Sequence, residues 1–146
     1  MQIYISGSLI TVKNREEAHR FYEFLADVCI KLEHTPYLPH QNSDPISHNK
    51  LTNKEVFKKD LDALLKSDMI LASITEPSTG VGAEIGIALE KNKQILAIYN
   101  KESTPSRFIL GLLNHIGINP IIFTNEKDCE EQIIDYFNKN IMVSQL

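Results

Sequence analysis

A single carboxylate, Glu84, follows a loop whose composition is typical of a ligand-binding turn. The loop, Pro-Ser-Thr-Gly-Val-Gly at residues 77–82, comes directly after an apolar run at residues 69–74. Glycines in such a turn let a ligand approach the backbone closely, and the N-terminus of the following helix favours anions. Phosphate-binding loops normally keep carboxylates away, so an acid at this place predicts chemistry as well as binding. One reaction that needs a partly desolvated carboxylate is glycosyl transfer, in which the carboxylate is the nucleophile.

The residues around Glu84 predict which side of its helix it occupies. Val81 and Ala88 share its face, and Ile85 and Leu89 lie beside that stripe. We therefore expect Glu84 in the first turn of a helix, at the border of the buried side. There the positive helix N-terminus would favour the ionised carboxylate. The alternative is a solvent-exposed acid that only interacts with the helix dipole.

Two further side chains are candidates for the same site. Asp60 lies between Val56 and Leu64 in a helical pattern, on or beside the apolar face, so it either faces a site or needs a partner. The alternative is an exposed acid paired with Lys59. Tyr4 lies in the first apolar strand, which would bring its hydroxyl near the same edge of the sheet. The alternative for Tyr4 is an ordinary core tyrosine.

Small and polar residues predict the other walls of the site. The Ser-Gly-Ser turn at residues 6–8 ends the first strand, and it lies beside the 77–82 loop if the first and third strands are neighbours. The polar segment 39–51 is long for a connection in a compact domain, and such loops are often lids. Its histidines, His40 and His48, are candidates for contact with a base or phosphate, and solvated loop histidines are the alternative.

Composition and missing motifs argue against several other functions. The net charge of −4 leaves no basic surplus for a nucleic-acid polymer or a membrane surface. Cys29 and Cys129 belong to no Cys-x-x-Cys pair, which indicates structural thiols in a reducing cytoplasm. There is no HExxH, no GxGxxG and no Walker lysine, so we expect neither a metal nor a cofactor. No apolar run approaches the roughly 20 residues of a membrane span, and we expect no signal peptide.

Strand-like and helix-like segments alternate along the chain, which predicts one α/β domain over residues 1–146, with no assignment after residue 140. The expected fold is flavodoxin- or Rossmann-like and has three layers, with a five-stranded parallel sheet of order 2-1-3-4-5 and helices on both faces. Strands are expected at residues 3–6, 35–38, 69–74, 95–99 and 120–123. Helices are expected at about 14–32 and 52–66, after the 77–82 loop, at about 105–117, and from Asn125 onward.

Four short motifs occur in order along the chain, and together they resemble one family. They are Tyr-x-x-Gly-Ser (Tyr4, Gly7, Ser8), Asp-Leu (Asp60, Leu61), Pro-Ser-x-Gly-Val-Gly-x-Glu-x-Gly (Pro77, Ser78, Gly80, Val81, Gly82, Glu84, Gly86) and Ser-x-x-Ile-x-Gly (Ser106, Ile109, Gly111). The chain resembles the nucleoside 2-deoxyribosyltransferase-like superfamily, most closely its 2′-deoxynucleoside 5′-monophosphate N-glycosidase branch. The resemblance covers residues 3 to about 137.

The resemblance implies a role for each of these residues. Glu84 would attack the anomeric carbon and release the base, and water would then resolve the covalent glycosyl-enzyme. Tyr4 and Asp60 would position and tune Glu84 or the sugar hydroxyls. A 5′-phosphate would be held by the serines and loop glycines of the motifs, namely Gly7, Ser8, Ser78, Gly80 and Gly82. Ser106 would reach that phosphate from the partner subunit of a homodimer.

One position departs from the branch pattern and leaves the substrate open. Ile10 stands where the branch has an arginine, which removes a bidentate phosphate donor, and Lys13 is a candidate point charge in its place. The sequence therefore leaves open whether the substrate is a nucleotide or a nucleoside. It also leaves open whether the sugar is ribose or 2′-deoxyribose. The expected function is hydrolysis of a (2′-deoxy)nucleoside 5′-monophosphate in the cytoplasm. The alternatives are a transferase that exchanges bases and a nucleotide-binding sensor domain without turnover.

Overall fold

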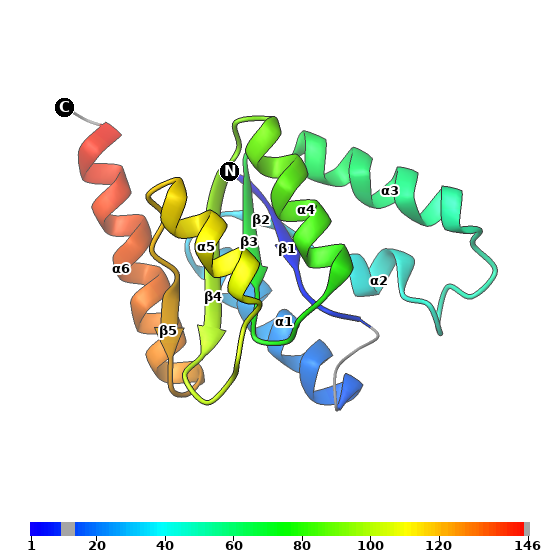
Figure 1. Cartoon of the computed structure of the whole chain (residues 1–146), viewed down its shortest axis with the longest axis horizontal. Helices are drawn as coiled ribbons and strands as arrows, with labels where there is room; N and C mark the ends of the chain where they lie inside the picture. Colours follow the sequence, from blue (N-terminus) through cyan, green and yellow to red (C-terminus); the bar gives the residue numbers. More distant parts are fainter. Residues whose placement is uncertain (10–13, 145–146) are drawn as a thin grey trace.

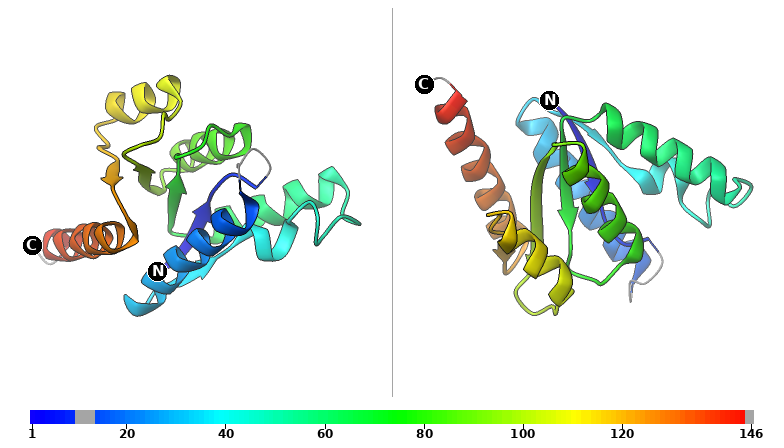
Figure 2. Two further views of the ribbon diagram at one scale, coloured as in Figure 1. Left: turned by 90° about the horizontal axis from the view of Figure 1, so that it is seen from below. Right: turned by 45° about the horizontal axis from the view of Figure 1, so that its top comes forward.

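The computed structural model describes residues 1–9 and 14–144, with side chains to residue 139. Five parallel strands form one sheet between two layers of helices (Figures 1 and 2). The sheet order is β2-β1-β3-β4-β5, which confirms the predicted fold. The strands are β1 (Gln2–Ser6), β2 (Thr35–Tyr37), β3 (Met69–Ser73), β4 (Gln94–Asn100) and β5 (Ile121–Phe123).

Side-chain caps begin the helices where the sequence predicts them. Asn14 accepts a hydrogen bond from the Glu17 amide at the start of the first helix, and Thr52 and Glu55 form a capping box before the third. The Asn125 side chain accepts from the Asp128 amide at the start of the last helix. The helices are α1 (Arg15–Lys31), α2 (Pro39–Ser43), α3 (Asn53–Lys66), α4 (Thr79–Glu90), α5 (Arg107–His115) and α6 (Glu126–Ser144).

Each face of the sheet has its own hydrophobic core. Helices α1 and α6 cover one face, and α3, α4 and α5 cover the other (Figure 2, left). Successive strand residues point to opposite faces, so Ile3 and Ile5 join the α1–α6 core while Tyr4 joins the α3–α4–α5 core. The parity of β1 therefore places Tyr4 on the same side as the helix that carries Glu84.

Strands β1 and β3 are direct neighbours, with Ser6 opposite Ala72. Their carboxyl ends consequently meet at one edge of the sheet, as the sequence predicts. The turn after β1 and the loop before α4 therefore lie together at this edge, where open α/β sheets bind ligands.

The segment 39–51 differs from the predicted loop. Its first five residues form the short helix α2, which begins at Pro39, a residue suited to the first helical position. His40 is buried, stacks on His19 with ring centroids 4.4 Å apart, and lies 3.3 Å from Glu23 through Nε2. His40 is therefore packed against α1, and the prediction of a solvent-exposed or ligand-facing histidine there is wrong. Across the described residues, none of the helices combines the length and apolarity needed to cross a bilayer.

Candidate active site

A cavity of about 600 Å³ opens at the carboxyl edge of the sheet, where the sequence predicts the site. Its lining comes from the turn after β1 at residues 7–9, from α2, from α3 and the segment between these two helices, and from the first turns of α4 with Ser78 before them. Asp60 and Glu84 are the carboxylates among its described lining residues. His48, one of the two histidines considered as candidates for contact with a base or phosphate, lines it as well.

Two hydroxyl groups hold the Glu84 carboxylate. Tyr4 donates to Oε1 over 2.7 Å, and Ser6 donates to Oε2. Glu84 lies in the second turn of α4, because the helix begins at Thr79 and its first turn carries no acid. The predicted first-turn position is therefore wrong, whereas the predicted border of the buried face is correct, since Val81, Ile85 and Ala88 are buried.

The surroundings of Glu84 favour its protonated form more than the sequence predicts. Burial raises the pKa of Glu84, the hydrogen bonds from Ser6 and Tyr4 oppose that rise, and the charge of Asp60 adds to it. Burial and the same carboxylate raise the pKa of Tyr4 far above its ordinary value. Tyr4 is therefore a neutral hydroxyl that donates its hydrogen bond to Glu84 at neutral pH.

Asp60 also faces the cavity, and its partners are hydroxyl groups. The Ser43 hydroxyl lies 2.9 Å from Oδ1 and 2.7 Å from Oδ2, and the Tyr37 hydroxyl lies 3.3 Å from Oδ1. Lys59 instead donates to the carbonyl of Asn42, which excludes the alternative of an exposed Asp60–Lys59 pair. Burial raises the pKa of Asp60, against the opposing effect of the hydrogen bonds and of Lys59.

The Ser43 hydroxyl permits two protonation states of Asp60. Its oxygen also lies 3.1 Å from the carbonyl oxygen of Pro39, which can only accept a hydrogen bond. When Ser43 donates its one proton to Pro39, a hydrogen bond to Asp60 needs a protonated carboxyl as donor. When Asp60 is ionised, Ser43 donates to it instead. The site can therefore hold Asp60 as an acid or as a carboxylate without losing a partner.

The two carboxylates are linked through stacked rings. Tyr4, which contacts Glu84, and Tyr37, which contacts Asp60, stack with their centroids 5.5 Å apart. Both tyrosines also feel the charges of both carboxylates. Any change in the protonation of one carboxyl is therefore felt by the hydrogen-bond partner of the other.

The predicted binding residues in the turn after β1 line the cavity and also pack against Tyr22. Gly7 and Ser8 line the cavity. The Tyr22 hydroxyl donates to the carbonyl of Ser8 over 2.9 Å, and a Cβ at Gly7 would lie 2.3 Å from the Tyr22 ring. Only glycine therefore fits at position 7 while Tyr22 keeps its place. Ile10 and Lys13 lie outside the described residues.

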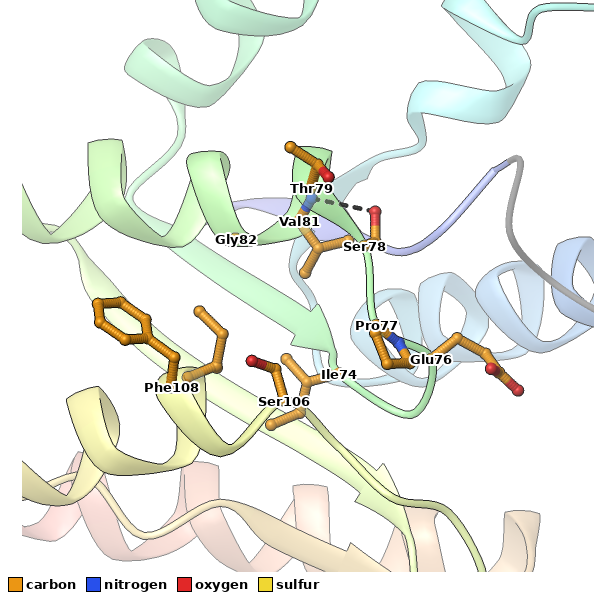
Figure 3. A pocket seen from close by; sticks show the side chains of 10 residues that line it. Ile74, Glu76, Pro77, Ser78, Thr79, Val81, Gly82, Ser106 and Phe108 are labelled. Atoms are coloured by element: carbon orange, nitrogen blue, oxygen red, sulfur yellow. Dashed lines mark hydrogen bonds between the residues drawn. The ribbon is translucent and has the colours of Figure 1, made fainter.

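The predicted binding residues of the second loop divide between two cavities. Ser78 and Gly80 line the cavity with Glu84, and the Ser78 hydroxyl caps α4 by accepting from the Val81 amide over 3.4 Å. Gly82 lines a second cavity, of about 350 Å³, between the start of α4 and the start of α5 (Figure 3). Ser106 lies there too, across from the α4 N-terminus and next to Phe108 (Figure 3). The structure thus brings Tyr4, Asp60 and Glu84 together within one chain but leaves Ser106 and Gly82 outside their cavity.

Several contacts of the site were not predicted. Ser6 lies in the predicted turn, and strand parity puts it on the same face as Tyr4, so its contact with Glu84 could have been inferred. Ser43 carries no such signal, because the segment between β2 and α3 shows no regular pattern. Tyr37 ends the short strand β2, and nothing in the sequence indicates that its hydroxyl meets Asp60. Among the described side chains, no cluster of three or more His, Cys, Asp or Glu residues is placed to hold a metal ion.

Comparison with known proteins places the chain in a family. The family model for nucleoside 2-deoxyribosyltransferase matches residues 3–139. A protein of Methanosarcina barkeri named as a 2′-deoxynucleoside 5′-phosphate N-hydrolase is 30% identical over 118 residues, which are 79% of this chain and 72% of that one. A 5-hydroxymethyl-dUMP N-hydrolase of Tetraodon nigroviridis is 27% identical over 146 residues, covering 96% of this chain and 99% of the relative.

The fold is shared with a solved enzyme structure. The CMP N-glycosidase of Clostridium botulinum matches with a TM-score of 0.69 at 20% identity, over 93% of this chain and 99% of that one. The family model covers nearly the whole chain, and the solved structure shares its fold over nearly the same length. The chain belongs to the nucleoside 2-deoxyribosyltransferase family of enzymes.

Proposed function

We propose that this enzyme hydrolyses the N-glycosidic bond of a nucleoside 5′-monophosphate, releasing the free base and the sugar 5-phosphate. The observation that carries the proposal is the Glu84 carboxylate, which Tyr4 and Ser6 hold in a cavity that a second carboxyl, that of Asp60, also lines. The names of the relatives in Methanosarcina barkeri and Tetraodon nigroviridis support the choice of a nucleotide over a nucleoside.

In the first step an oxygen of ionised Glu84 attacks C1′ of the sugar. A C1′–O bond forms, the C1′–N bond breaks, and its electron pair leaves with the base. Tyr4 and Ser6 orient the two carboxylate oxygens and keep their hydrogen bonds to the glycosyl ester. Water then attacks C1′, which returns Glu84 as a carboxylate and leaves a hydroxyl on the sugar.

Asp60 is the proposed proton carrier for both steps. As an acid it gives its proton to the departing base, and as a carboxylate it then takes a proton from the attacking water. Its raised pKa and the two hydrogen-bond patterns of Ser43 support this exchange. Burial in the cavity makes a neutral Asp60 accessible without a metal ion.

The proposed phosphate end of the cavity is the first turn of α4. The free amides of a helix N-terminus bind phosphate, and Ser8, Ser78 and Gly80 surround them. His48 is the basic side chain among the described lining residues, and its imidazole is a further candidate to bind the phosphate. We place Ser106 at the phosphate of the partner subunit in a homodimer, because it does not line the cavity of its own chain.

The outward side of α4 and α5 supports such a dimer. Phe108 is 80% exposed, and Gly86 has open space around it, as an interface between close-packed helices requires. We further propose a reducing, cytoplasmic setting, since Cys29 and Cys129 are both unpaired and buried.

A substrate panel tests the proposal. Ribo- and deoxyribonucleosides and their 5′-monophosphates are incubated with and without a free acceptor base, and base release is followed by chromatography. We expect release from monophosphates without acceptor, its loss in Glu84→Gln, and its retention in Glu90→Gln, which removes an exposed acid at the other end of α4. Turnover only with an acceptor would assign base exchange instead, the reaction for which the family is named. No turnover, with binding retained, would indicate a sensor domain.

A further inference from the structure

Arg15 is not among the lining residues of the cavity, but it contacts two of the segments that line it. Its Nη1 donates to the carbonyl of Leu9, on the wall that follows β1. Its Nη2 lies 2.5 Å from Oδ2 of Asp44, the residue that begins the segment 44–49. Leu9, at the end of the turn after β1, lines the cavity, and so do Pro45, His48 and Asn49 of the segment 44–49. One guanidinium group therefore joins the two walls.

Asp44 determines the conformation of its own wall. Oδ1 accepts hydrogen bonds from the amides of Ile46, over 2.8 Å, and Ser47, over 2.9 Å. The Asp44 carbonyl accepts from the amide of His48 over 2.8 Å, and the Ser47 hydroxyl lies 3.1 Å from Nδ1 of His48. The position of His48, which lines the cavity, thus depends on where the Asp44 carboxylate is held.

The Asp44 carboxylate is ionised and needs a cation. Burial opposes its ionisation, but the amides of Ser47 and Ile46 and the Arg15 guanidinium outweigh burial and lower the pKa of Asp44. His19 also lies near Oδ2, at 3.5 Å, but burial and the neighbouring His40 lower the pKa of His19. Arg15 is therefore the cation that stays with Asp44 at neutral pH.

Arginine is suited to this place for a geometric reason. Its planar fork donates in two fixed directions, so it can hold a carbonyl and a carboxylate at a set separation, whereas a lysine ammonium is a single point. The Arg15 side chain is about a quarter exposed and that of Asp44 is almost fully buried, so solvent cannot replace both contacts.

We propose that Arg15 is a positioning residue of this active site, which fixes the turn after β1 and the segment 44–49 at the separation that the substrate needs. The proposal rests on the proposed function for its substrate. Arg15 itself touches neither the substrate nor Glu84. Its loss leaves the Tyr4 and Ser6 contacts of Glu84 in place, so it acts on substrate binding and leaves the chemical step intact.

The first test is a kinetic comparison of three variants on the best monophosphate. Arg15→Met is expected to raise KM at least about tenfold and to change kcat by less than about threefold, as the loss of hydrogen bonds to a charged group suggests. Arg15→Lys restores the charge and one contact, so its KM is expected between the two. Arg20→Met removes an exposed arginine of the same helix and is expected to match the wild type. A fall in kcat with KM unchanged would overturn the proposal.

The second test needs no substrate and separates this proposal from the proposed function. Hydrogen exchange of the Ile46 and Ser47 amides is measured in the free proteins by mass spectrometry. We expect faster exchange of this segment in Arg15→Met and in Arg15→Lys, with no change in Arg20→Met. If the wild type hydrolyses no substrate, the proposed function fails while the exchange result still tests the connection between the walls. Unchanged exchange in the Arg15 variants would overturn it, and Arg15→Lys provides this readout if Arg15→Met does not fold.

Discussion

The Tyr4 hydroxyl donates to Oε1 of Glu84 over 2.7 Å, joining a central strand to the helix of the neighbouring crossover, 80 residues further along the chain. Tyr4 has no exposed surface and stacks on Tyr37. The contact is therefore rigid. It directs Oε1 of Glu84 toward strand β1, and Glu84 also lines the cavity. The proposed nucleophile is therefore held by the core of the protein and needs no mobile loop to orient it.

Tyr4→Phe is expected to lower kcat by roughly 10- to 100-fold, because a hydrogen bond to a charged group is worth about 1.5–3 kcal/mol. The ring keeps its packing, so the melting temperature should change little. Steady-state kinetics and thermal unfolding measure the two effects. Tyr99→Phe, on strand β4, is the matched control and should leave kcat unchanged. Wild-type kcat in Tyr4→Phe would show that the contact does not serve the reaction.

Glu84→Gln is expected to stabilise the folded protein at neutral pH. The folded state raises the pKa of Glu84, so it binds this proton more tightly than the unfolded chain does. Wild-type stability from this group is therefore fully present below the unfolded pKa and is lost as pH rises through the folded pKa. The variant does not ionise, so its advantage should grow as the pH rises from the ordinary glutamate pKa of about 4.3 through the raised pKa of folded Glu84. Urea unfolding at several pH values checks the sign, and Glu90→Gln should show no such trend.

Ser43→Ala is expected to shift the alkaline limb of the pH–kcat profile upward. The Ser43 hydrogen bond lowers the pKa of Asp60, so its removal raises that pKa further. If Asp60 must carry a proton to the base, activity then persists to higher pH than in the wild type. The alkaline limb of the wild type should itself lie above the ordinary range of an aspartate. A downward shift of the limb in Ser43→Ala would contradict the acid role of Asp60.

Gly7→Ala is expected to lower the free energy of unfolding by about 1–3 kcal/mol, the usual cost of overpacking a tight site. The added Cβ would lie 2.3 Å from the buried Tyr22 ring, and the ring cannot move without losing its hydrogen bond to Ser8. Denaturant unfolding measures the loss. Gly111→Ala is the control, since nothing lies within 4 Å of its Cβ, and it should stabilise helix α5 by about 0.5–1 kcal/mol.

The fold and the centre of the site could be predicted from the sequence because both depend on regular patterns. Alternating strands and helices give the sheet order, and Tyr4, Asp60 and Glu84 each carry a periodicity that points inward. The predicted turn position of Glu84 was wrong because the cap at Ser78 begins helix α4 inside the 77–82 loop, earlier than the glycines of that loop suggest.

The walls of the site could not be predicted in the same way. The roles of Ser43, Asp44 and Arg15 depend on the path of the segment between β2 and α3, which no pattern describes. Arg15 looks like an ordinary first-turn residue of an amphipathic helix. Its contacts to Leu9 and Asp44 become visible only when α1 is packed against the sheet.

Mixing two variants tests whether Ser106 serves the site of a partner chain. Glu84→Gln is expected to be inactive, and Ser106→Ala is expected to raise KM for the monophosphate by about tenfold through loss of a hydrogen bond to a charged phosphate. In a mixed dimer, the intact Glu84 of one chain would meet the intact Ser106 of the other. Activity at low substrate should therefore rise above that of Ser106→Ala alone once the subunits have exchanged. No rise after exchange, which native mass spectrometry can verify, would show that Ser106 does not complete the partner's site.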